Sequence, residues 1–108
     1  MMVQIDLSEL TSAHSKVLAG HQRGVAARAL YHIDDLDEDN VSDLVIVAPG
    51  QLETISPSFV QGFLGATLKK IGPDALKKRL NLSALKPFLR DDFIIGIQRL
   101  TLRSQVEH

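Results

Sequence analysis

The chain has no cysteine, no tryptophan and only one tyrosine among its 108 residues. The lack of cysteine excludes disulfides, thiolate metal sites and thiol nucleophiles, and it fits a reducing compartment. The sequence also lacks an apolar run of the roughly 18 residues that a membrane-spanning helix needs. Its first residues do not have the basic start and long apolar core of a signal peptide. We therefore expect a cytoplasmic protein that makes no membrane contact.

Length and composition indicate one globular domain over residues 1–108, because 44% hydrophobic residues are enough for a core and 23% charged residues are ordinary. The net charge of −1 hides an uneven distribution. Residues 1–55 carry three basic and nine acidic side chains, whereas residues 56–108 carry nine basic and four acidic ones. These opposite charges either cancel within one fold or attract a second copy, so a homodimer is one expectation.

Hydrophobic periodicity and turn residues predict alternating strands and helices. Strands are expected at residues 3–7, 44–48 and 79–82, and the apolar run at 44–48 is typical of a central strand covered on both faces. Residues 34–40 are so acidic that we expect a surface loop. Helices are expected at 24–31, 56–71, 74–78 and 86–103, with a strand over 93–102 as the alternative to the last of them.

The clearest local signal marks the helix over residues 56–71. Ser56 is a good N-cap because its hydroxyl accepts from a free backbone N–H, and Pro57 suits the first helical position. Gly72 followed by a proline ends the helix. Gly62 and Gly65 lie among its apolar positions, which predicts that a neighbouring backbone packs closely there.

Residues 45–65, which contain the run Ile-Ser-Pro-Ser-Phe at 55–59, resemble the central segment of the STAS-like domains of uncharacterised function. That family is distantly similar to the STAS domains of sulfate transporters and anti-sigma factor antagonists. Residues 78–83 resemble the following strand and turn of the family, and Gly24 and Arg28 resemble its first helix. The resemblance implies an α/β fold with a four-stranded mixed sheet packed with three to four helices, in a bacterial or archaeal regulatory module.

The resemblance also implies how the protein acts, namely by docking to a protein partner such as a histidine-kinase-like ATPase of the anti-sigma type. The implied partner-binding residues are Thr54, Ser56, Ser58 and Gln61. Ser56 and Ser58 are also candidate phosphorylation sites. The chain departs from the family where Ala48 replaces the acidic end of the strand and Pro57 occupies the phosphoacceptor position, so a phosphorylation switch does not follow from the resemblance.

No pattern for catalysis is present. The serines lack a Gly-x-Ser-x-Gly elbow, and no two histidines have the helical spacing of a metal site. We therefore expect no catalytic residue, no metal ligand and no cofactor. Residues 20–24, before a helix, could place backbone N–H groups and Arg23 or Arg28 against an anion. The alternative is that these arginines pair with the acidic segment 34–40.

A nucleic-acid-binding protein is the alternative function. It rests on a basic cluster between residues 69 and 86, which consists of Lys69, Lys70, Lys77, Lys78, Arg79 and Lys86. Two predicted helices joined near Gly72 could imitate a helix-turn-helix. Phosphate contacts would require these side chains to share one face, and the near-zero net charge argues against it.

Overall fold

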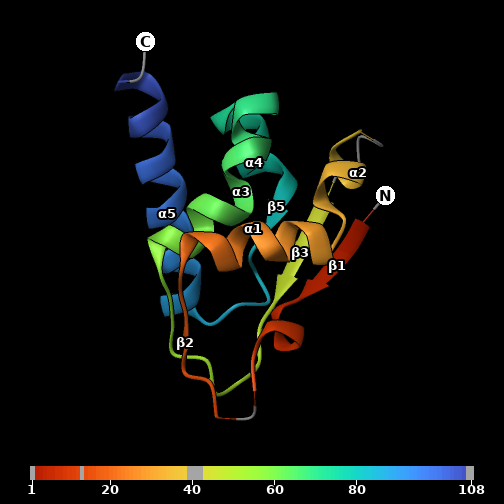
Figure 1. Ribbon diagram of the computed structural model, residues 1–108, viewed down its shortest axis with the longest axis vertical. Coiled ribbons are helices and arrows are strands. Elements are labelled where there is room, and N and C mark those ends of the chain that lie inside the picture. Colours follow the sequence, from red (N-terminus) through yellow and green to blue (C-terminus); the bar gives the residue numbers. More distant parts are fainter. Residues whose placement is uncertain (1, 13, 39–42, 107–108) are drawn as a thin grey trace.

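The computed structural model describes residues 2–12, 14–38 and 43–106 and has an α/β fold (Figure 1). Its main sheet has three parallel strands in the order β1-β3-β5, which are β1 (Met2–Asp6), β3 (Asp43–Val47) and β5 (Leu80–Asn81). A separate parallel pair consists of β2 (Val17–Leu18) and β4 (Thr54–Ile55). The prediction that residues 44–48 form a central strand is confirmed, because β3 lies between the other two.

The prediction of one four-stranded mixed sheet is wrong. Helical crossovers return the chain from β1 to β3 and from β3 to β5, so these strands run in the same direction. By contrast, β2 follows β1, and β4 follows β3, through short connections without such a return. These two strands therefore pair with each other at a distance from the main sheet (Figure 1).

The described residues also form six helical segments. They are the 3-10 helix η1 (Leu7–Leu10) and the α-helices α1 (His21–Leu30), α2 (Ile33–Glu38), α3 (Pro57–Ile71), α4 (Pro73–Arg79) and α5 (Pro87–Val106). The helix predicted over 86–103 is confirmed against its strand alternative. The helix predicted from Gly24 begins earlier, at His21.

The acidic segment is not the surface loop that its composition predicts. Residues up to Glu38 form α2, because Ile33 and Asp37 lie one helical turn apart and both are buried. Residues 39–40 of the predicted loop lie outside the described residues. A helix thus forms here from two inward-facing positions, although four of its six residues are acidic.

The main sheet has one covered face. Leu44 and Ile46 of β3 are fully buried with Ile5 of β1, whereas Val45 is half-buried and its partners in the register, Gln4 and Asn81, are exposed. The prediction that β3 is covered on both faces is therefore wrong. Two right-handed crossovers that advance in one direction put their helices on the same face of a sheet, and α1 and α3 pack together there.

The core is mainly aliphatic and centres on α3. The ring of Phe59 stacks on that of Phe63 with centroids 5.6 Å apart, and Phe93 of α5 is also fully buried. The close packing between α3 and α5 includes Gly96, where an added Cβ would lie 2.6 Å from the side chain of Val60. The helix α3 therefore lies between α1 and α5 and contacts both.

Candidate functional site

The starts of α1 and α3 meet at Ser58. Ser56 caps α3 as predicted, since its hydroxyl accepts from the backbone N–H of Phe59 at 3.2 Å. The hydroxyl of Ser58 lies 2.8 Å from that of Ser56 and accepts from the backbone N–H of Gly20 at 3.3 Å. Gly20 is the residue that precedes α1. The structure therefore brings together the turn at residues 20–24 and the serines at the start of α3, which the sequence indicated as separate candidate segments.

Two glycines allow α1 and α3 to cross with their backbones in contact. A Cβ on Gly62 would lie 2.0 Å from the carbonyl oxygen of His21, and a Cβ on Gly24 would lie 2.2 Å from that of Phe59. The predicted close approach at Gly62 is thus confirmed. At Gly65 a Cβ would meet only the side chain of Leu100, at an ordinary 3.9 Å.

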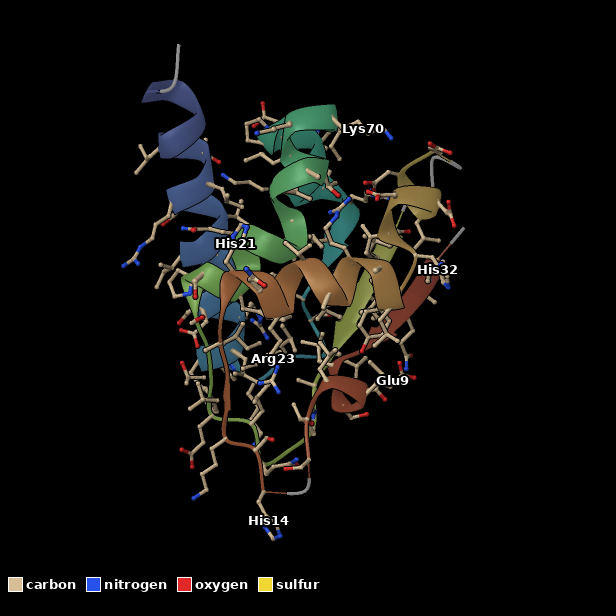
Figure 2. All side chains as sticks on the ribbon, in the orientation of Figure 1. Glu9, His14, His21, Arg23, His32 and Lys70 are labelled. Atoms are coloured by element: carbon tan, nitrogen blue, oxygen red, sulfur yellow. The ribbon has the colours of Figure 1, made fainter. Side chains whose placement is uncertain are left out.

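A groove of about 470 Å³ runs beside this crossing. It is lined by His21, Val25, Arg28, Asp34, Gln61, Gly62, Gly65, Ala66, Leu68, Lys69 and Leu100. Val25 leaves 49% of its surface exposed, and other apolar side chains, those of Ala66, Leu68 and Leu100, line the groove with it. Figure 2 shows His21 and Arg23 projecting from opposite sides of α1, and Arg23 does not line the groove.

The predicted partner-binding residues have different roles. Gln61 lines the groove, and Ser58 lies at the junction of the two helix starts. Thr54 instead donates its hydroxyl hydrogen to Asp92 at 3.0 Å, and the same carboxylate oxygen accepts the N–H of Ile55 at 2.9 Å. Thr54 therefore fastens β4 to α5. Sequence reasoning did not single out Asp92, which is 38 residues away.

The side chain of Arg28 makes its hydrogen bonds and ion pairs within the protein. Its buried guanidinium donates to the carbonyl oxygen of Phe63 at 2.7 Å and to the hydroxyl of Thr67 at 2.8 Å. It also pairs with Asp34 at 2.5 Å and Asp37 at 3.3 Å. This confirms for Arg28 the alternative that it pairs with the acidic segment. Arg23 is exposed and stays a prediction as an anion ligand.

Asp37 is the centre of a buried polar network. Its carboxylate accepts from Arg28 of α1, from Thr67 of α3 at 2.7 Å and from Arg79 of α4. Burial alone raises the pKa of Asp37, but hydrogen bonds from Arg79, Thr67 and Arg28 and the charge of Arg79 outweigh it, so the pKa is below its ordinary 3.8. The carboxylate is therefore ionised at neutral pH and joins four helices. Its spacing of four residues from Ile33 was the signal that could have revealed it.

The basic cluster does not gather on one face. Arg79 is buried against Asp37, and Lys86 donates to the carbonyl oxygen of Gly50 at 2.6 Å. Lys69 lines the groove beside α1, whereas Lys77 and Lys78 line a different cavity. Phosphate recognition by the cluster as a unit thus has little support from this arrangement.

In the described part of the chain, no group of three or more His, Asp or Glu side chains is placed to hold a metal ion. None of the described helices is both long enough and apolar enough to span a bilayer. Comparison of the chain with protein-family models, with curated proteins and with solved structures found no match.

Proposed function

We propose that this protein is a non-catalytic regulatory module of the STAS-like kind that docks a histidine-kinase-like ATPase. The partner would bind at the surface formed by His21, Val25, Ser58 and Gln61, named here the α1/α3 surface. The observation that carries the proposal is the contact of Ser58 with Gly20, which joins two candidate segments into one surface beside a groove. The motif at residues 55–59 supports the choice of partner class.

The α1/α3 surface has the composition of a protein-binding site. Exposed Val25 supplies apolar area, His21 and Gln61 line the groove with it and supply hydrogen-bonding groups, and Ser58 lies at the nearby junction of the two helix starts. Interfaces commonly combine an apolar centre with a polar rim. The backbone contact at Gly24 and Gly62 keeps the two helices in a fixed relation, so little ordering entropy is lost when a partner binds.

Ser58 is the better candidate of the two for regulation by phosphorylation. The hydroxyl of Ser56 already caps α3, whereas that of Ser58 spans the two helix starts. A phosphoryl group on Ser58 would be stabilised by the helix N-terminus. It would also replace the Gly20 contact and add a dianion to the α1/α3 surface. We propose that such a change weakens partner binding.

Biolayer interferometry between the full chain and purified histidine-kinase-like ATPases of the same genome tests this proposal. We expect Val25→Asp and Gln61→Arg each to weaken binding at least about tenfold, which corresponds to about 1.4 kcal/mol. Gln98→Arg is the matched control, because Gln98 is exposed on α5 and lines neither the groove nor the other cavity. The proposal fails if no ATPase binds, or if Gln61→Arg binds as well as Gln98→Arg.

A further inference from the structure

A second and larger cavity lies away from the α1/α3 surface and shares no lining residue with its groove. It measures about 680 Å³, which is within the range of ligand sites. Four segments contribute to it: the start of β3, the end of α4, the strand β5 with the residues after it, and the middle of α5. The lining residues are Asp43, Lys77, Lys78, Leu80, Asn81, Leu82, Ser83, Arg90, Ile94 and Ile97.

One wall of this cavity is the edge of the main sheet. β5 pairs with β3 on one side, and no other described strand pairs with it. An edge strand presents backbone N–H and C=O groups that an additional strand can use. Residues of α5 line the same cavity, which therefore lies between α5 and β5, a strand of two residues, and is named here the channel. Extended peptides bind in channels of this kind by adding a strand to the sheet.

The apolar part of the lining is unevenly covered. Leu80 and Leu82 are half-buried, Ile97 is buried, and Ile94 leaves 39% of its surface exposed. In a strand, alternate side chains point to the same side. An added strand could therefore place every second residue, if apolar, against Ile94 and Leu82, while the residues between them point the other way.

The charges of the lining select for an acidic ligand. Lys77, Lys78 and Arg90 are cationic, and Asp43 is the one carboxylate among the described residues that line the cavity. Arg90 donates from Nη2 to the carbonyl oxygen of Leu85 at 3.3 Å, and its buried Nε has no acceptor among the residues that the structure describes. The positive charge of this guanidinium attracts a carboxylate in the cavity, although the buried Nε itself does not face a ligand there.

We propose that the channel between β5 and α5 binds an extended peptide segment of a protein partner that alternates apolar residues with Asp or Glu. The backbone of the segment adds to the edge of β5, its apolar side chains cover Ile94 and Leu82, and its carboxylates meet Lys77, Lys78 and Arg90. This site is separate from the α1/α3 surface and does not depend on the ATPase as partner.

The probe is the peptide Val-Glu-Ile-Glu-Val with an uncharged fluorophore on its N-terminus and an amide at its C-terminus, because these caps remove the terminal charges and leave only the side-chain carboxylates. Fluorescence anisotropy with the full chain should show saturable binding that weakens as salt is added. A peptide with Lys in place of Glu should not bind. One with Pro in place of Ile should bind at least about tenfold more weakly, because proline removes a backbone donor.

The double variant Lys77→Glu/Lys78→Glu should lose at least about tenfold in peptide affinity. Lys69→Glu/Lys70→Glu is the control, because it makes the same charge change on two exposed lysines that do not line the channel. Amide NMR shifts on peptide addition should centre on residues 80–83 and 90–97. Equal loss in the two double variants, equal binding of the Lys peptide, or shifts centred elsewhere would overturn the proposal. Gln61→Arg should leave peptide binding unchanged, which separates this site from the α1/α3 surface.

Discussion

The chain builds the same path twice from very different residues. The first unit, residues 2–38, runs through β1, η1, β2, α1 and α2, and the second unit, residues 43–79, runs through β3, β4, α3 and α4 without a counterpart of η1. Their strands pair in register, β1 with β3 and β2 with β4. The backbone N–H of Ser56 also donates to the carbonyl oxygen of Leu18 at 2.9 Å, next to the paired residues Leu18 and Ile55 where β2 and β4 end. A shared topology therefore does not require a shared sequence.

The two units differ in how their long helices are held. In α3, seven residues are buried, including Phe59 and Phe63, because α3 packs against helices on two sides. In α1 the buried residues are Gly24, Ala27 and Arg28, and it packs mainly on α3. Apolar burial therefore stabilises the second unit. The helix α1 of the first unit depends instead on the glycine contact with α3 and on the buried charges around Asp37.

The substitution Asp37→Asn should have the largest effect on this arrangement. It removes the charge that is shared by Arg28 of the first unit and Arg79 of the second, and it leaves both guanidiniums buried with less compensation. We expect a loss of about 3–5 kcal/mol in the free energy of unfolding, measured by urea denaturation at pH 7. Asp35→Asn is the control, because Asp35 lies on the same helix with a side chain 73% exposed, and it should change stability by less than about 0.5 kcal/mol.

The stability difference between the natural chain and Asp37→Asn should also depend on pH. Because the folded-state pKa of Asp37 is below its ordinary 3.8, the carboxylate adds stability above about pH 4, and this is lost as the pH falls through the folded value. The stability gap between the natural chain and Asp37→Asn should be constant above about pH 5 and should shrink below pH 4. A gap that persists undiminished at the lowest pH where both proteins fold would contradict the assigned role.

Asp37 also shows where sequence reasoning stops. The helix α3 could be predicted with its bounds because its signals are local: Ser56, Pro57 and Gly72 act on their own backbone neighbours. The composition around Asp37 indicated a solvated loop, since nothing nearby in the sequence compensates a buried carboxylate. Its partner Arg79 lies 42 residues away. The opposite charges of the two halves do meet within the fold at this ion pair.

The site was predictable in its parts and not in its assembly. The turn at residues 20–24 and the serines at 56 and 58 each had a local pattern. Their contact depends on the crossing of α1 and α3, which joins positions 38 residues apart. The parallel pairing of β2 with β4, in strands of two residues, gave no periodicity to detect. The role of Thr54 could not be predicted from local sequence either, because its partner Asp92 comes from the distant helix α5.

The crossing of the two units gives the second-largest predicted effect. Gly62→Ala and Gly24→Ala each place a methyl group against the backbone of the other helix. Each substitution should therefore lower the free energy of unfolding by about 2–3 kcal/mol, measured by thermal or urea denaturation. Gly50→Ala is the control, because a Cβ there meets no atom within 4 Å. Since both substitutions open the same crossing, the double variant should lose less than the sum of the two. Strict additivity would show that the helices relax independently.

The smallest effects on stability should come from substitutions at the starts of α1 and α3. At α3 the cause is loss of a side-chain cap, whereas at α1 it is backbone strain. Ser56→Ala removes the cap of α3 and should cost about 1 kcal/mol, whereas Ser56→Asp should restore it. Gly20 precedes α1 with φ of +104° and no side-chain cap, so Gly20→Ala should cost about 1–2 kcal/mol through backbone strain. Gly20→Ser should be no better, although serine is a good cap elsewhere, because the hydroxyl cannot relieve that φ. If thermal denaturation showed Gly20→Ser to be stabilising, the starts of the two helices would be alike after all. The first unit would then differ from the second only in what it buries.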